Sequence, residues 1–120
     1  MPTLLMRIVN VFWVPLLIIA LRIGRDNARA SAAHILGERG SRLASNALIR
    51  ALRDRSSTVR WRAADALAEL ADQRALPVLE SIWENKQEED LVVLTAILHA
   101  LRVLNPKKYG EPYITQQAAY

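Results

Sequence analysis

Apolar residues recur along the chain at the spacing of an α-helix rather than of a β-strand. Between residues 57 and 70 they stand three or four positions apart, which places them on one helix face. They are Val59, Ala63, Ala66, Leu67 and Leu70. No stretch alternates apolar and polar residues well enough to predict a strand. The pattern predicts an all-α protein.

This helical pattern is repeated. Residues 28–52 align with residues 59–83 at a constant offset of 31, and seven of the 25 paired positions are identical. The identical pairs are Arg29/Arg60, Ala32/Ala63, Ala33/Ala64, Leu36/Leu67, Glu38/Glu69, Ala44/Ala75 and Leu48/Leu79. A further offset of 34 carries the apolar pattern onto residues 93–104. Self-similarity at this period indicates a solenoid of stacked repeats.

Each repeat is expected to contain two helices. The first helix would have Ser57 as its N-cap, or Asp26 one repeat earlier, because these residue types favour that position. The second would begin at Pro77, since proline fits the first turn of a helix. Its apolar stripe, Leu48, Ala51 and Leu52, recurs as Leu79, Ile82 and Trp83.

Four features within residues 52–83 resemble the HEAT repeat, particularly the short bacterial type first noted in phycobilin lyases. They are a Leu-x-Asp turn (Leu52, Asp54), a Val-Arg pair (Val59, Arg60), an Ala-Ala pair (Ala63, Ala64) and an Ala-Leu-Pro sequence (Ala75 to Pro77). The resemblance implies a right-handed ARM/HEAT-type α-solenoid of about three helical hairpins. The third unit departs from the pattern, because Leu94 replaces the arginine of the Val-Arg pair.

We expect one repeat domain over residues 1–104 and a C-terminal tail over residues 105–120. The units of the domain are a partial leading repeat (1–24) and repeats at about 27–55, 58–86 and 90–104. The last repeat helix cannot continue past Pro106. The tail is then either disordered or an extended arm on a partner. Its candidate anchors are Tyr109, Tyr113, Ile114 and Tyr120.

Residues 12–23, FWVPLLIIALRI, are the most apolar run in the chain. The offset of 31 maps Pro77 onto Pro15. It predicts that this run is the second helix of the leading repeat, with residues 2–11 as a stub of the first. Trp13, Leu17, Ala20 and Leu21 would then pack on the array. Ile18 and Ile19 would point outward, at a solenoid end that normally carries a polar cap.

A membrane anchor or interfacial helix is the alternative for this region. Residues 4–23 have about the length of a bilayer crossing. The uncharged run between Arg7 and Arg22 is shorter, however, and Pro15 interrupts it. Such a length is more typical of a buried or interfacial helix. Both interpretations need something to cover the outer face, whether a partner protein, a second copy or lipid.

Charge is unevenly distributed along the 120 residues. Residues 1–62 contain eleven arginines and three acidic residues, whereas residues 63–120 contain five basic and nine acidic residues. This asymmetry favours an anionic partner for the first half. The expected basic strip comprises Arg22, Arg50, Arg53 and Arg55 on second helices, with Arg25, Arg60 and Arg62 at the turns.

Candidate chemistry is sparse. His34, Asp65 and His99 occupy equivalent repeat positions, but stacked helices lie about 8–10 Å apart, too far for ligands that approach zinc to about 2 Å. We therefore expect an exposed polar row there and no metal site. The absence of cysteine excludes disulfides and thiolate sites. No Ser-His-Asp set, phosphate loop or paired catalytic carboxylates occur, so we predict no catalytic residue and no cofactor.

The sequence thus predicts a non-enzymatic protein–protein interaction module, an adaptor or assembly factor, expected in the cytoplasm. The predicted interaction surface comprises Ile18, Ile19, Arg22, Arg50, Arg53 and Trp61. Self-association is equally compatible with it. One alternative is a module attached to an anionic membrane through residues 4–23 and its arginines. Phosphate-backbone binding to nucleic acid and bilin-lyase-like activity are further alternatives.

Overall fold

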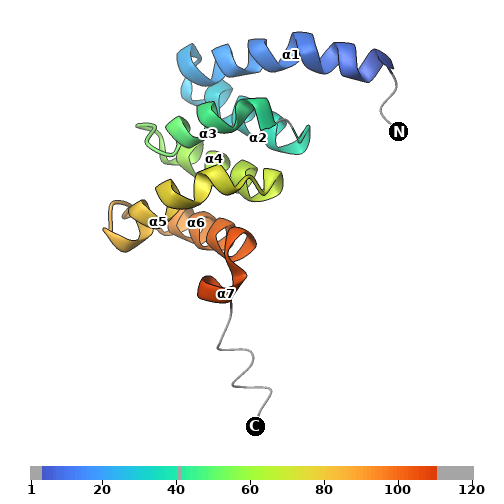
Figure 1. The fold of residues 1–120 in the computed structure, drawn as a ribbon. Coiled ribbons are helices and arrows are strands. Elements are labelled where there is room, and N and C mark those ends of the chain that lie inside the picture. Colours follow the sequence, from blue (N-terminus) through green and yellow to red (C-terminus); the bar gives the residue numbers. More distant parts are fainter. Residues whose placement is uncertain (1–3, 41, 111–120) are drawn as a thin grey trace.

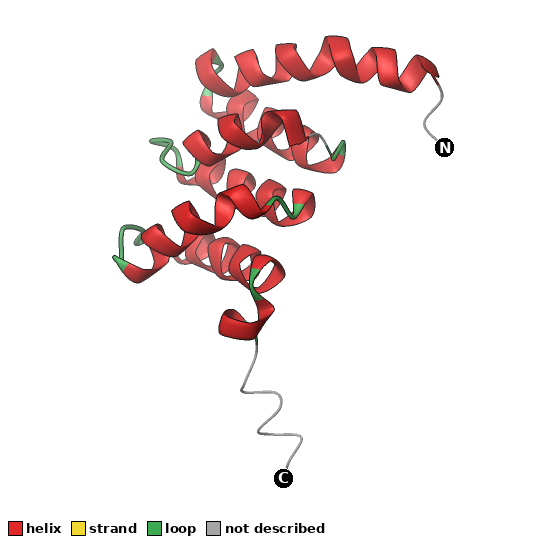
Figure 2. Ribbon diagram, in the orientation of Figure 1, coloured by secondary structure: helices red, strands yellow, loops and turns green. Residues whose placement is uncertain are grey.

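The computed structural model describes residues 4–40 and 42–110, and for residues 4–12 it describes the backbone alone (Figure 1). The described residues form helices and no strand (Figure 2). The helices are α1 (Leu4–Ile23), α2 (Asp26–Glu38), α3 (Ser45–Ala51), α4 (Ser57–Leu70), α5 (Leu76–Glu84), α6 (Leu91–Leu104) and α7 (Pro106–Tyr109). Short 3₁₀ turns at Arg42–Ala44 and Gln73–Ala75 precede α3 and α5. The predicted all-α solenoid is confirmed.

The helices are arranged in two layers. In one layer α2, α4 and α6 stack in sequence, and in the other α1, α3 and α5 each pack on a helix of the first layer (Figure 1). The main packing between successive repeats is that of α2 on α4 and of α4 on α6. Helix α1 therefore lies at one end of the array, and its N-terminal part reaches past α2 and α3 (Figures 1 and 2).

Small side chains bring the stacked helices close together. Leu36, Leu67 and Leu101 are fully buried in the C-terminal halves of α2, α4 and α6. Buried alanines on the same helices surround them. At Gly37 the approach is closest, because a Cβ atom there would lie 2.7 Å from both Cα and Cβ of Ala66. Only glycine fits at that contact between α2 and α4 without a shift of the backbone.

A buried arginine closes the hairpin of α2 and α3. The Arg29 side chain, 4% exposed, donates hydrogen bonds to both carboxylate oxygens of Asp54, each at 2.9 Å. It also donates to the Gly24 carbonyl and to the Asp26 carboxylate, each at 2.7 Å. Asp54 in turn accepts the Ser56 backbone N–H at 2.8 Å. These bonds hold the turn between α3 and α4 against the start of α2.

The same arrangement recurs one repeat later. Arg60 donates to the two carboxylate oxygens of Glu88 at 2.7 and 3.2 Å and to the Asp54 carbonyl at 2.7 Å. Glu88 accepts the Asp90 backbone N–H at 3.0 Å. The next equivalent position holds Leu94, so this series of ion pairs stops where the repeat pattern departs in the sequence.

A second contact between hairpins lies at the opposite end of the helices. The buried Ser45 hydroxyl donates to the Asp72 carboxylate at 2.8 Å, and the Arg74 side chain binds the same carboxylate at 2.6 Å. Asp72 also accepts the Arg74 backbone N–H at 3.0 Å. The hydrogen bonds from Arg74, and then from Ser45, hold the pKa of Asp72 far below its usual range.

The prediction for the leading repeat is wrong in one respect. Residues 4–11 are not a separate stub, because α1 runs unbroken from Leu4 to Ile23 with Pro15 inside it. In α5, by contrast, Pro77 stands in the first turn as expected. The difference is the turn that precedes Pro77, where Asp72 caps a 3₁₀ helix; α1 has no such turn before its proline. The proline therefore costs one backbone hydrogen bond without ending the helix.

The expected N-caps are also corrected. Ser57 and Asp26 are the first residues inside α4 and α2, and the N-cap positions are taken by Ser56 and Arg25 without side-chain cap bonds. Asp26 binds Arg29 instead. In α6 the cap is Asp90, whose side chain accepts the Val92 and Val93 backbone N–H groups.

Past α6 the chain turns at Asn105, and Pro106 opens the single helical turn α7. Lys108 binds Glu84 at 2.7 Å and Glu80 at 3.1 Å, and the Tyr109 hydroxyl donates to Glu80 at 2.9 Å. These bonds fix α7 to α5, so Tyr109 anchors the chain to its own array. The expected anchors Tyr113, Ile114 and Tyr120 lie outside the described residues.

Candidate interaction surfaces

The outward face of α1 is apolar. Large side chains stand in water along it: Trp13 (52% exposed), Leu16 (58%), Ile19 (51%) and Ile23 (80%). An α-helix turns about 100° per residue, so Leu16, Ile19 and Ile23 fall within a sector of about 60°. We call Trp13, Leu16, Ile19 and Ile23 the α1 face.

The opposite side of α1 packs on the array. Val14 and Leu21 are buried there, and Leu17, Ile18 and Ala20 are partly buried against the core. Two expectations are thereby corrected: Trp13 is exposed rather than packed, and Ile18 is partly buried rather than outward. Val14 takes the place expected for Trp13, because the unbroken helix continues the spacing 14–18–21 instead of entering a turn.

Five exposed arginines cluster at the two turns nearest α1. They are Arg22, Arg25, Arg50, Arg53 and Arg55. Arg22 and Arg50 line a small hollow between α1 and α3, together with Leu21, Ala47, Ala51 and Asp54. None of the five side chains has an ion-pair partner among residues 4–40 and 42–110. We call these five residues the arginine cluster.

Other members of the expected basic strip lie elsewhere or are neutralised. Arg60 is bound to Glu88, and Arg62 stacks on the Trp61 ring at 4.1 Å from its centroid. Arg53 and Arg55 lie in the turn after α3 rather than on a second helix, because α3 ends at Ala51. The rest of the strip lies at the C-terminal ends of α1 and α3 and in the turns that follow them.

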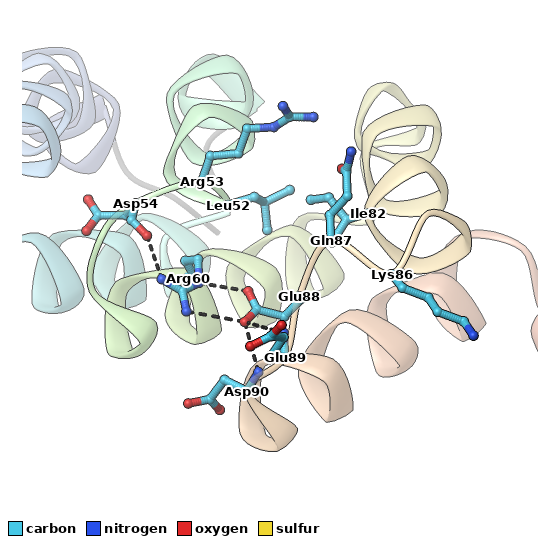
Figure 3. A pocket seen from close by; sticks show the side chains of 10 residues that line it. All are labelled: Leu52, Arg53, Asp54, Arg60, Ile82, Lys86, Gln87, Glu88, Glu89 and Asp90. Atoms are coloured by element: carbon cyan, nitrogen blue, oxygen red, sulfur yellow. Dashed lines mark hydrogen bonds and ion pairs between the residues drawn. The ribbon is translucent and has the colours of Figure 1, made fainter.

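A broad groove of about 910 Å³ lies between the α3–α4 and α5–α6 turns (Figure 3). Its floor is made by the buried side chains of Leu52 and Ile82, and the Arg53 side chain extends over it. The Arg60–Glu88 pair forms part of its wall. The remaining lining residues are Asp54, Lys86, Gln87, Glu89 and Asp90. With its main acid and base bound to each other, the groove lacks a convergent catalytic set.

A second groove, of about 550 Å³, runs between α4 and α6 on the other face of the array. Trp61 and Leu98 contribute partly exposed apolar surface, and Val92 is 57% exposed. Asp65, Thr95, Ala96, His99 and Arg102 complete the lining. We call this the Trp61 groove. Its exposed apolar members could not be identified from the sequence, apart from Trp61 itself.

The histidine row does not converge. His34 Nε2 lies 3.0 Å from Glu38, and its Nδ1 lies 3.5 Å from Arg62, whereas Asp65 and His99 line the Trp61 groove. In the part of the chain that the structure describes, no three His, Cys, Asp or Glu side chains are grouped to hold a metal ion. Within that same part, no helix combines the length and the sustained hydropathy that a membrane span needs.

Comparisons with known proteins agree with this architecture. A search of curated proteins gave no match. A family model for HEAT repeats matches residues 14–102, most of the helical array. The matched region begins inside α1 and ends inside α6, and it includes both the Arg29–Asp54 and the Arg60–Glu88 ion pairs. The chain therefore belongs to the HEAT-repeat family.

Proposed function

We propose that this protein is a non-enzymatic adaptor or assembly factor that binds a partner protein in the Trp61 groove. HEAT repeats are commonly protein-interaction modules and are generally non-enzymatic. The observation that carries the proposal is the partly exposed Trp61 beside the exposed Val92 in a groove between two helices. Tryptophan is strongly enriched among the residues that dominate protein–protein binding energies.

The composition of the groove fits a protein segment. Trp61, Val92 and Leu98 offer an apolar centre, and Asp65 and His99 provide a polar rim, which is the usual anatomy of an interface. The Arg62 guanidinium over the Trp61 ring holds the indole in place. A pre-positioned aromatic ring loses little conformational freedom on binding. The expected ligand is a partner segment that places an apolar side chain between α4 and α6.

Site-specific photo-crosslinking in cells tests this proposal. With p-benzoylphenylalanine at position 61, we expect a discrete adduct with one protein, identified by mass spectrometry. Position 43 is the control, because Leu43 is 80% exposed and lies outside the groove. Co-expressed wild-type protein should compete for the partner and reduce the yield of the adduct. Co-expressed Trp61→Ala protein should leave the yield unchanged. Equal labelling from positions 61 and 43 would overturn the proposal.

A further inference from the structure

We propose that the α1 face and the arginine cluster together bind an anionic lipid surface, with α1 lying in the plane of the interface. This surface is distinct from the Trp61 groove, which lies between α4 and α6. The two surfaces would let one small module join a membrane and a protein.

The α1 face has the residues that an interfacial helix requires. Leu16, Ile19 and Ile23 are apolar and exposed, and Trp13 at their margin is the residue type enriched where hydrocarbon meets headgroups. The opposite side of α1, with Val14 and Leu21, is buried against the array. Only the outward face is therefore available for burial, which suits a helix that lies on a membrane.

Charge selects the lipid class. The first acidic residue in the chain is Asp26, and its carboxylate is bound to Arg29. Up to that point α1 and the following turn carry positive charge alone. The arginine cluster forms no ion pair within residues 4–40 and 42–110, and Arg22 lies on α1 itself. The neighbouring Asp54 carboxylate is bound to Arg29. Guanidinium groups bind phosphate bidentately, so lipid phosphates and carboxylates complete this surface.

The shape of the surface favours lipid over a folded partner. The α1 face is a single convex helix at the end of the array, and part of α1 projects past α2 and α3 (Figure 1). Lipid adapts to a convex apolar ridge, whereas a protein would have to supply a matching groove. A second copy would bring two arginine clusters, each with an excess of positive charge, towards each other.

Vesicle co-sedimentation of the full chain tests the inference. The probes are vesicles of phosphatidylcholine alone and of phosphatidylcholine mixed with phosphatidylserine. We expect binding to the mixed vesicles that weakens as salt is raised. Replacing two exposed isoleucines, Ile19→Glu with Ile23→Glu, should weaken binding at least about 100-fold, given the value of burying such side chains. The matched control, Leu91→Glu with Val103→Glu, introduces the same charges on exposed positions of α6 and should bind like the wild type.

A second set of double variants tests how much the arginines contribute to vesicle binding. Arg22→Gln with Arg50→Gln, two residues of the same hollow, should lower the partition coefficient about fivefold per arginine, the fold-change that one basic residue near an anionic surface provides. Lys86→Gln with Lys107→Gln removes the same charge from the turn after α5 and from α7, at the other end of the array, and should have little effect. Circular dichroism verifies that all variants keep their helical content.

Tryptophan fluorescence reports whether α1 enters the interface. In a Trp61→Phe, Trp83→Phe background that retains the wild-type helical signal, lipids with bromine in the acyl chains should quench Trp13. Unquenched Trp13 would overturn the inference, as would equal binding to both vesicle types. Self-association or protein binding through the α1 face, with no vesicle binding, would assign the face to that partner instead.

Discussion

The guanidinium of Arg29 and the carboxylate of Asp54 form two parallel hydrogen bonds of 2.9 Å across 25 residues of sequence. Both groups are largely shielded from water, with 4% and 13% of the side chains exposed. The pair ties the start of α2 to the turn after α3 and so closes one helical hairpin. Because the carboxylate also holds the Ser56 N–H, the same group fixes the start of α4.

Removing that carboxylate should be far more damaging than removing its exposed neighbour. Asp54→Ala strands the buried Arg29 charge, and we expect it to lower the free energy of unfolding by about 3 kcal/mol. Asp26→Ala also removes a carboxylate that binds Arg29, but Asp26 is 61% exposed, so the expected loss is below about 1 kcal/mol. Urea denaturation of both variants checks the difference. Equal losses would contradict the structural role assigned to Asp54.

Leu67 tests the packing of the central helix. It is fully buried in α4 between α2 and α6. Leu67→Ala leaves a cavity that the stacked helices cannot close, so the expected destabilisation is about 2–5 kcal/mol. Leu43→Ala makes the same chemical change at an exposed position and should stay within about 0.5 kcal/mol of the wild type. A midpoint unchanged by Leu67→Ala would refute the proposed repeat register.

Gly37 should reverse the usual order of helix propensity. Alanine is the better helix former by about 0.8–1.0 kcal/mol, yet a Cβ at position 37 would collide with Ala66 at 2.7 Å. We expect Gly37→Ala to destabilise the protein by about 1–3 kcal/mol through overpacking. Ser31→Ala on the exposed side of α2 is the control and should be neutral or slightly stabilising. Thermal unfolding measures the effect, and a melting temperature of Gly37→Ala equal to or above that of the wild type would contradict the close contact with Ala66.

Stability should fall in acid. Hydrogen bonds from Arg74 and Ser45 lower the pKa of Asp72. Burial alone would raise the pKa of Asp54, but the bonds from Arg29 and Ser56 lower it overall. A carboxylate with a lowered folded-state pKa stabilises the fold above the pKa of the unfolded chain, about 3.9, and loses that contribution as pH falls through the folded-state value.

The free energy of unfolding should therefore be nearly constant from pH 7 to about pH 5 and decline below about pH 4. Asp72→Asn cannot titrate, so its acid decline should be shallower than that of the wild type. Urea titrations at a series of pH values measure both slopes. Parallel acid limbs for the two proteins would show that Asp72 does not contribute to the decline.

The fold was accessible from the sequence because its apolar spacing is repeated. Val59 and Leu67 have counterparts one repeat away, and a repeated stripe can be buried only by stacking. Helix α1 was harder to predict. Its proline matches Pro77 in the alignment, but nothing in the sequence shows that the turn needed to start a new helix is missing. Because the helix was expected to begin near Pro15, Trp13 was predicted to be buried, whereas the structure buries Val14.

The candidate surfaces could be predicted from the sequence only in part. An apolar outer face on the first helix and an excess of arginine follow from composition and spacing. Which arginines lack partners does not. The repeat pairs Arg29 with Arg60 and Arg22 with Arg53. Only the fold shows that carboxylates reach the first pair. The Trp61 groove likewise depends on how α6 sits beside α4, which fixes the distance between Trp61 and Val92 in space.

The stacking of α2, α4 and α6 also governs how the molecule folds and opens. The hydrogen bonds between hairpins join residues only about one repeat apart, so the loops that must close are short and folding should be fast. Helix α4 has stacked neighbours on both sides, whereas α2 and α6 each have one in that layer. Amide protons of α4 should therefore exchange last, through complete unfolding, while fraying proceeds inward from both ends. Any ligand held on α1 would slow exchange first at the end of the array where it binds.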